Sequence, residues 1–208
     1  MASPTPPDLE GLQYLSQEER QARRLKLPAG EDFWVFGYGS LMWHPGFPHT
    51  EVRPARLRGL HRSFCVYSHR YRGTPEAPGL VLGLDRGGSC HGMAFRVPAA
   101  EGEETLDYLF EREMLTGIYH ASWRSAETRE GALRVMTFVV DRSHRQYAGN
   151  LGHDAMVALI LQGCGDRGPC LQYLENTVHH LRALGLEDRA LERLLTEAER
   201  LRGKGGSK

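Results

Sequence analysis

A run of apolar residues enters a glycine-spaced turn at Phe33-Trp34-Val35-Phe36-Gly37-Tyr38-Gly39-Ser40-Leu41. Apolar side chains at every position of the run predict a β-strand that is buried on both faces. Gly37 and Gly39 have no side chain where the backbone turns, so backbone N–H groups can approach an anionic or carbonyl oxygen closely. The stretch therefore predicts a polar binding loop on a rigid strand, although an ordinary strand end followed by a turn has the same spacing.

Length and composition indicate one main domain and a small ligand. The chain has 208 residues, of which 40% are hydrophobic and 25% are charged, enough for one sizeable core. Lys plus Arg and Asp plus Glu each number 26, so the charge balance does not indicate nucleic acid or an anionic membrane as a partner. We expect an N-terminal extension over residues 1–30, one domain over residues 31–202 and a flexible tail over residues 203–208.

The four cysteines and the N-terminus indicate a cytoplasmic protein. Cys65, Cys90, Cys164 and Cys170 form no CxxC pair, and a chain of this length does not need disulfide bonds to fold. The first 30 residues have neither the apolar core of a signal peptide nor the acid-poor composition of a transit peptide. No run approaches the roughly 20 apolar residues that span a bilayer.

Periodicity predicts strands first and helices last. The pattern predicts strands over Arg56–Ser68, Leu80–Leu84, Cys90–Val97, Tyr119–Ala126 and Leu133–Val140. The second and third of these would form a hairpin around a glycine-containing turn at Asp85–Ser89. Helices are expected over Leu9–Leu25, over Ala99–Leu115 and through the last third of the chain, with Gly185 as a helix stop and Arg72–Gly79 as a loop. This order favours an antiparallel or mixed sheet packed with helices over a doubly wound parallel sheet.

The central helix carries an acid in its apolar stripe. Leu106, Leu109, Phe110 and Glu113 follow the i, i+3, i+4, i+7 spacing of a buried helix face, whereas the pattern directs Arg112 elsewhere. A carboxylate among apolar side chains is desolvated, which raises its pKa and makes it a stronger base when ionised. The alternative is that the helix ends near Met114, so that Glu113 lies in a frayed last turn, solvated or paired with an arginine.

Three motifs, in order and spacing, carry a resemblance to a known family. They are Val35-Phe36-Gly37-Tyr38-Gly39-Ser40-Leu41, Arg72-Gly73-Thr74-Pro75-Glu76-Ala77-Pro78-Gly79 and Tyr108-Leu109-Phe110-Glu111-Arg112-Glu113-Met114. The chain resembles the ChaC family of γ-glutamylcyclotransferases from about Trp34 to the helical third, where Tyr173-Leu174 matches a family Tyr-Leu pair. It departs at His120, where a proline is expected after Tyr119.

The resemblance implies a fold, a reaction and a site. The fold would be α+β, a γ-glutamylcyclotransferase-like small mixed β-barrel with flanking helices. The reaction would cleave the γ-glutamyl amide of glutathione to 5-oxoproline and Cys-Gly, with no metal or organic cofactor. Glu113 would be the general acid/base, and the substrate-binding residues would be Val35, Phe36, Gly37, Tyr38, Gly39, Ser40 and Leu41, with Arg72 and Tyr173 as further candidates.

Other functions stay open from the sequence. A cysteine nucleophile with a histidine base is one, since the chain has four cysteines and ten histidines, but nothing pairs them locally. A metal site at His44 and His49 or at His179-His180 is another, without a companion acid or cysteine at ligand spacing. The third is a non-catalytic binding module with the same cavity. Within the enzyme class, other γ-glutamyl amines or dipeptides are alternative substrates.

Overall fold

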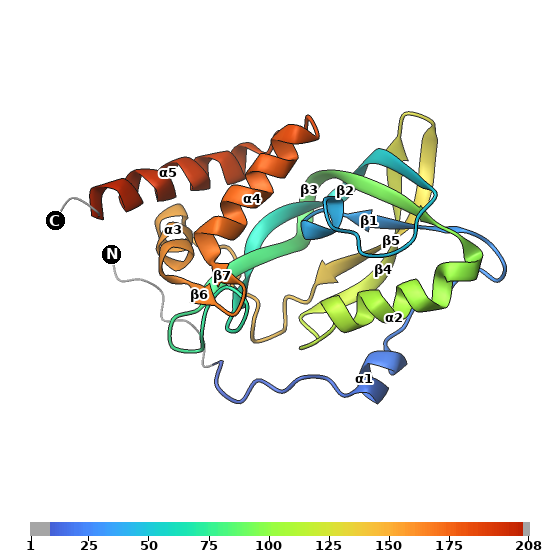
Figure 1. Ribbon diagram of the computed structural model, residues 1–208, viewed down its shortest axis with the longest axis horizontal. Helices are drawn as coiled ribbons and strands as arrows, with labels where there is room; N and C mark the ends of the chain where they lie inside the picture. Colours follow the sequence, from blue (N-terminus) through green and yellow to red (C-terminus); the bar gives the residue numbers. More distant parts are fainter. Residues whose placement is uncertain (1–8, 206–208) are drawn as a thin grey trace. The chain divides into compact units, whose positions relative to one another are not determined.

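The computed structural model describes residues 9–205, and its sheet is a closed five-stranded barrel. The strands are hydrogen-bonded in the order β1-β3-β2-β4-β5 (Figure 1). Their bounds are Phe33–Gly37 for β1, Glu51–Ser68 for β2, Gly79–Val97 for β3, Tyr119–Thr128 for β4 and Gly131–Val140 for β5. Because β1 pairs antiparallel with β3 and parallel with β5, the expectation of a mixed β-barrel in an α+β fold is confirmed.

The chain divides into two compact units. The barrel unit consists of residues Leu12–Arg62 and Gly83–His144. The helical unit contains Ser63–Leu82 and the chain from Arg145 onward, together with the described residues 9–11. Strands β2 and β3 each continue from one unit into the other. The boundaries expected from the sequence, at residues 31 and 202, stay predictions.

Strand β1 is buried as its apolar sequence predicts. Val35 pairs with Phe95 of β3 and with Met136 of β5, so both edges of β1 are hydrogen-bonded. Val35 and Phe36 have no exposed surface. Trp34 is half-buried, and the guanidinium of Arg53 lies 4.9 Å from its ring centroid. One position of the run therefore faces outward, under a cation–π contact.

The predicted hairpin at Asp85–Ser89 is wrong. Both expected strands belong to one strand, β3, which continues through this segment without a turn. Gly87 and Gly88 have φ angles of +103° and +63°, a backbone region that glycine adopts without a steric penalty. The Nδ1 atom of His61 on β2 lies 3.1 Å from the carbonyl oxygen of Gly87. The two glycines therefore make an irregularity within a strand that stays beside β2, which the dipeptide alone does not distinguish from a turn.

The central helix is shorter than the sequence predicts. A 3₁₀ turn at Ala99–Glu101 precedes α2, which spans Gly102–Glu113. Leu106, Leu109 and Phe110 are each at most 3% exposed and belong to the core that fills the barrel unit. The predicted apolar stripe is thus confirmed, and the helix ends at the acid.

The N-terminal helix is also shorter than expected. Helix α1 spans Gln17–Ala22 rather than Leu9–Leu25. Ser16 and Glu19 form a reciprocal capping box, which fixes the start of the helix. Gly30, with φ +68°, ends the connection to β1.

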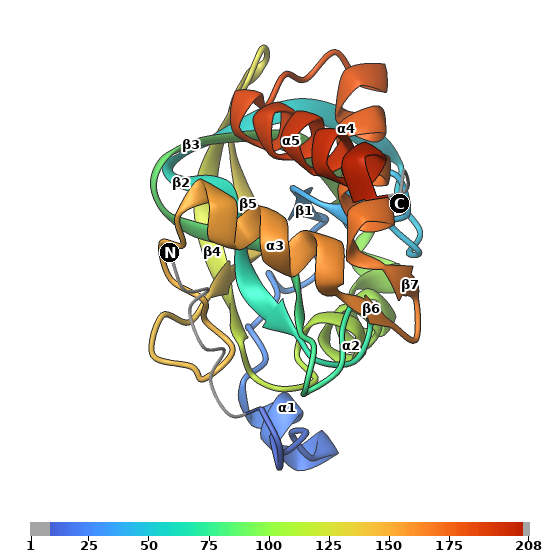
Figure 2. The same cartoon turned by 90° about the vertical axis from the view of Figure 1, so that its left-hand side faces the viewer.

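The helical unit contains three helices and a short hairpin (Figure 2). Helices α3, α4 and α5 pack against one another. Their bounds are His153–Gln162, Cys170–Ala183 and Arg189–Gly205, and the hairpin strands are Cys164–Gly165 (β6) and Gly168–Pro169 (β7). Gly185, with φ +68°, follows α4 and confirms the predicted stop. The tail expected from Gly203 is helical to Gly205, and residues 206–208 lie outside the described residues.

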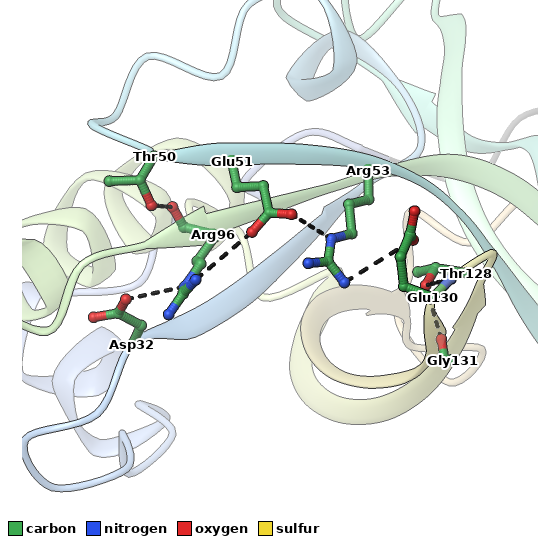
Figure 3. A network of polar contacts seen from close by, with 8 residues as sticks. All are labelled: Asp32, Thr50, Glu51, Arg53, Arg96, Thr128, Glu130 and Gly131. Atoms are coloured by element: carbon green, nitrogen blue, oxygen red, sulfur yellow. Dashed lines mark hydrogen bonds and ion pairs between the residues drawn. The ribbon is translucent and has the colours of Figure 1, made fainter.

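A chain of ion pairs crosses the outer surface of the barrel unit (Figure 3). Arg96 on β3 contacts Asp32 at 3.0 Å and Glu51 on β2 at 3.7 Å. Arg53 continues the chain from Glu51 at 2.5 Å to Glu130 at 4.0 Å, beside the β4–β5 turn. Exposed ion pairs contribute about 0–1 kcal/mol each, so the apolar interior contributes most of the stability. Within residues 9–205, no helix combines the length and the hydropathy that a membrane span requires.

Candidate active site

The glycine loop turns sharply at the end of β1. A 3₁₀ turn at Ser40–Met42 follows Gly39, and the N–H of Met42 donates to the carbonyl of Gly39 at 2.9 Å. A β carbon built on Gly37 would lie 3.0 Å from the β carbon of Leu41 and 3.3 Å from the N atom of Met42. The chain thus folds back onto Gly37 so closely that a larger residue would have to displace backbone. This close approach accounts for glycine at position 37.

The first N–H groups of this turn have no acceptor within the turn. The first donors of any helical turn have no acceptor inside the turn. In the part of the chain that the structure describes, nothing accepts a hydrogen bond from the N–H of Ser40 or Leu41. Two neighbouring N–H groups can bind one anionic or carbonyl oxygen.

A buried arginine is hydrogen-bonded to the glycine loop. Arg62 on β2 is 7% exposed, and its Nε donates to the carbonyl of Tyr38. Its Nη2 donates to the carbonyl of His91 on β3 at 2.6 Å. The loop is therefore fastened to two strands by one charged side chain. Sequence reasoning missed Arg62.

Four other residues of the loop that were predicted to bind substrate are buried and pack within the barrel unit. Val35, Phe36 and Tyr38 are 0%, 0% and 7% exposed, and Leu41 is 5% exposed. The carbonyl of Phe36 accepts a hydrogen bond of 3.1 Å from Thr137 on β5. These four residues stay predictions as substrate contacts.

Glu113 is the last residue of α2 and lies in the same unit as the loop. Its side chain is 19% exposed, and Met114 caps the helix by donating to the carbonyl of Phe110. The position combines both expectations, because the acid continues the buried stripe and also lies in the last turn. Its neighbourhood is not purely apolar: Nε of Arg112 lies 3.1 Å from Oε1 of Glu113.

Arg112 joins the acid to the glycine loop. Its Nη2 donates to the hydroxyl oxygen of Ser40 at 2.7 Å, and its Nη1 donates to the carbonyl of His44 at 2.8 Å. The same side chain thus contacts the acid and two residues of the turn after β1. The sequence expectation that Arg112 lies away from the acid is wrong. Helical periodicity separates adjacent side chains, but a long arginine at the helix end reaches back across its neighbour.

Tyr108 supports Arg112 from one turn earlier on α2. Its hydroxyl accepts a 2.8 Å hydrogen bond from Nη1 of Arg112, and its ring centroid lies 5.9 Å from the guanidinium carbon. A β carbon on Gly46 would lie 2.0 Å from the tyrosine hydroxyl, and Gly46 has φ +75°. Glycine at position 46 therefore leaves the space for the tyrosine.

The guanidinium has an electrostatic consequence for the acid. Arginine stays charged at any pH at which proteins fold, and a nearby cation stabilises the ionised form of a carboxylate. Arg112 is itself held by Ser40, His44 and Tyr108. The carboxylate of Glu113 is thus oriented by a guanidinium that has a fixed position.

The helical unit holds the two remaining predicted site residues together. The guanidinium of Arg72 lies 5.4 Å from the ring centroid of Tyr173, and its Nη1 donates to the carbonyl of Pro169 at 3.1 Å. Burial lowers the pKa of Arg72. The ring of Tyr173 packs edge-on against Phe64, with 5.7 Å between centroids. Both residues are half-buried.

Close backbone packing fixes the loop that carries Arg72. A β carbon on Gly163 would lie 2.4 Å from the carbonyl oxygen of Arg72, and one on Gly165 would lie 2.1 Å from that of Arg70. The N–H groups of Asp166 and Arg167 donate to loop carbonyls at 2.8 and 2.9 Å. Gly163, just before β6, and Gly165 in β6 thus leave the space that lets the hairpin pack against the loop.

Cys170 is not an activated nucleophile. None of the four cysteines forms a disulfide bond; Cys65, Cys90 and Cys170 are buried, and Cys164 is exposed. Burial raises the pKa of Cys170 to about 11, and its thiol donates to the carbonyl of Leu80 at 3.0 Å. A buried, protonated thiol is a weak nucleophile.

Comparison with known proteins identifies the family. The family model described as ChaC-like protein matches residues 33–201. The chain belongs to the ChaC-like family. It is 36% identical to the glutathione-specific gamma-glutamylcyclotransferase of Escherichia coli (strain K12), over 81% of this chain and 73% of that protein. It is 30% identical to glutathione-specific gamma-glutamylcyclotransferase 1 of Mus musculus, over 78% and 76% of the two chains.

A solved structure shares the fold of this family member. The crystal structure of a yeast gamma-glutamyl cyclotransferase specific to glutathione superposes with a TM-score of 0.75 at 21% identity. The match covers 82% of this chain and 96% of the yeast chain. The mixed barrel with flanking helices is therefore shared with that protein.

Proposed function

We propose that this protein is a γ-glutamylcyclotransferase that cleaves glutathione into 5-oxoproline and Cys-Gly. The observation that carries the proposal is the connection between Glu113 and the glycine loop through Arg112. A carboxylate joined in this way to the glycine loop, within one unit of the ChaC-like fold, supports roles for the two in proton transfer and substrate binding. Two relatives are named glutathione-specific gamma-glutamylcyclotransferases, and these names support glutathione as the substrate.

The substrate supplies its own nucleophile. The α-amine of the γ-glutamyl group attacks the γ-carbonyl carbon, and a five-membered ring forms as the amide bond to the cysteinyl nitrogen breaks. Well-oriented intramolecular attack reaches effective molarities of about 10⁵ M or more, so holding the γ-glutamyl chain in a folded conformation contributes much of the acceleration. The reaction consumes no water.

Glu113 balances the protons of this reaction. The α-amine is mostly protonated at neutral pH, so the carboxylate of Glu113 takes one proton from the α-ammonium group. The protonated acid gives this proton to the departing cysteinyl nitrogen, and the second proton that the ring nitrogen loses as the lactam forms follows by the same carboxylate, so Cys-Gly leaves with a protonated amine. One carboxylate serves both steps and ends the cycle in its starting form.

The glycine loop binds the γ-glutamyl half. The N–H groups of Ser40 and Leu41 support contact with an oxygen that carries negative charge, either the α-carboxylate or the oxyanion on the γ-carbonyl. Gly37 and Gly39 allow the close approach, and Arg62 holds the carbonyl of Tyr38 by a hydrogen bond. Arg72 and Tyr173 stay predictions as further substrate contacts.

The test is product analysis with the purified protein. Incubation with glutathione should release 5-oxoproline and Cys-Gly in equal amounts, without glutamate. Glutamate in place of 5-oxoproline would show hydrolysis and contradict the cyclisation. Selectivity is measured with a panel of other γ-glutamyl amines and dipeptides. If one of these compounds has a higher kcat/KM than glutathione, it and not glutathione is the preferred substrate.

A further inference from the structure

The segment between residues 12 and 30, here the N-terminal segment, lies outside the region that the family model matches. It belongs to the barrel unit, and Figure 1 shows α1 alongside α2. Helix α1 has six residues, none of them buried. A helix of this length is not stable alone, so contacts outside it must hold the segment in place.

The segment binds the first half of α2 through charged groups. Nη2 of Arg24 contacts Oε2 of Glu103 at 3.0 Å, and its Nη1 contacts Oδ1 of Asp107 at 3.0 Å. The amide of Gln21 donates to the same Asp107 oxygen at 3.2 Å. Arg24 is 18% exposed, so this arginine is screened from water more than its two partners.

The segment also contacts the turn immediately after α2. The N–H of Leu15 donates to the carbonyl of Leu115 at 2.8 Å, two residues beyond Glu113. A β carbon on Gly117 would lie 2.8 Å from Nη1 of Arg23 and 3.3 Å from a methyl group of Leu15. The turn and the segment therefore pack without space between them.

Apolar contacts connect these two attachment points. Leu25 and Leu27 pack against the core that contains Leu106, Leu109 and Met114. A β carbon on Gly102, the first residue of α2, would lie 3.0 Å from a methyl group of Leu27. The segment thus follows α2 from its first residue to the turn beyond its last.

We propose that the N-terminal segment positions Glu113 by fixing the C-terminal end of α2. Helix ends fray because their last carbonyl groups have no partner within the helix, and Glu113 is the final helical residue. The segment fixes the turn that follows and so limits the movement of this carboxylate. Proton transfer depends on this placement, since a displacement of about 1 Å can lower a rate about 100-fold. The inference rests on the proposed function, because it gives Glu113 the catalytic proton transfer.

Arg24→Gln removes the ion pairs with Glu103 and Asp107, and Leu15→Ala, which keeps the backbone hydrogen bond to Leu115, removes the side chain beside Gly117. The two variants, alone and together, loosen the two attachment points. We expect the double variant to lower kcat for glutathione about 3- to 10-fold with KM within about twofold, because orientation and not binding is lost. Hydrogen exchange at the amide of Met114, which donates to Phe110, should become faster. The melting temperature should fall by at most about 4 °C. Arg24→Lys, which keeps the charge, should recover part of kcat.

Arg56→Gln is the matched control, because Arg56 also forms an exposed ion pair in the barrel unit, with Glu127. It should change neither kcat nor exchange at Met114. Unchanged kcat in the double variant despite faster exchange overturns the positioning role, as does unchanged exchange. A wild-type protein that forms no 5-oxoproline overturns the proposed function instead, and the exchange comparison then still decides whether the segment orders the end of α2.

Discussion

The guanidinium of Arg112 donates a 2.7 Å hydrogen bond to the hydroxyl oxygen of Ser40, while its Nε lies 3.1 Å from the carboxylate of Glu113. One side chain therefore sets the distance between the acid at the end of α2 and the first residue of the 3₁₀ turn. The acid and the loop are fixed relative to each other before any substrate binds. Such preorganisation is the property that an intramolecular cyclisation needs from its enzyme.

Glu113→Gln should remove turnover while the protein stays folded. The amide keeps the shape of the side chain but cannot accept a proton, so we expect kcat to fall at least about 1000-fold with glutathione binding retained. Product formation and calorimetric binding measure the two effects. Glu111→Gln, an exposed neighbour on the same helix, is the control and should keep full activity. Release of Cys-Gly at a near-normal rate by the Glu113→Gln variant would disprove the assignment.

Arg112→Lys should lower activity although it keeps the positive charge, because several hydrogen-bond donors of the guanidinium are lost. A lysine ammonium cannot contact Glu113, Ser40 and His44 together, so kcat should fall about tenfold or more. Ser40→Ala removes one of these contacts from the other side. In the Arg112→Lys/Ser40→Ala double variant, the decrease in kcat should be smaller than the sum of the two single effects, with a coupling energy of about 1 kcal/mol. Strict additivity of the two changes would mean that the Arg112–Ser40 contact does not contribute to catalysis.

Arg62→Met should destabilise the fold and the loop together. The change removes the arginine donor from the carbonyls of Tyr38 and His91, and the loss of hydrogen bonds from a charged, buried group costs about 1–3 kcal/mol each. We expect a lower urea midpoint and a lower kcat. Arg58→Met on the same strand removes an exposed pair with Glu127 and should change stability by less than about 1 kcal/mol. Equal effects of the two variants would show that burial of Arg62 is unimportant.

Gly37→Ala should impair activity more than stability. The added methyl group would press on Leu41 and on the backbone of Met42, so the turn that presents the N–H groups must shift by a few tenths of an ångström. Overpacking of this kind costs about 1–3 kcal/mol, within the stability of a typical domain. Activity and a thermal melt measured side by side test this. Full activity of the alanine variant would show that the exact path of the turn is not needed.

Thiol alkylation should separate the exposed cysteine from the buried ones. Cys164 should react with iodoacetamide at neutral pH without loss of activity, because no cysteine takes part in the proposed reaction. Burial raises the pKa of Cys170 to about 11, so its reactive thiolate should be absent at neutral pH and appear only as the pH approaches that value. Mass spectrometry locates the label. Inactivation that parallels labelling at neutral pH would favour a cysteine mechanism.

Local pattern predicted the parts of the fold that depend on local physics. The apolar run of β1 and the stripe of α2 are repeated spacings, and both lie where those spacings place them. The hairpin at Asp85–Ser89 failed because adjacent glycines permit positive φ in a turn and within a long strand alike. Only the neighbouring strand β2 decides between them, and that pairing is not local.

The candidate site was also predicted only in part, because some of its contacts join residues that are far apart in the sequence. Glu113 stood out as an acid on an apolar face, and the same logic would have found Arg62, which alternates with the buried residues Leu60 and Phe64 on β2. Gly59, with φ +75°, obscures that alternation by shifting its phase after Leu57. The contact of Arg112 with Ser40 joins residues 72 positions apart, so no local pattern contains it.

The double pairing of β1 also constrains how the protein is made. The carbonyl of Phe36 accepts its hydrogen bond from Thr137, 101 residues later in the chain, so the support of the glycine loop needs a strand synthesised long afterwards. Closing such a large loop is entropically costly and slows folding. A nascent chain that lacks β5 can form helices and hairpins on the ribosome but cannot assemble this site. Catalytic competence should thus arise late during translation, which limits premature turnover by unfinished chains.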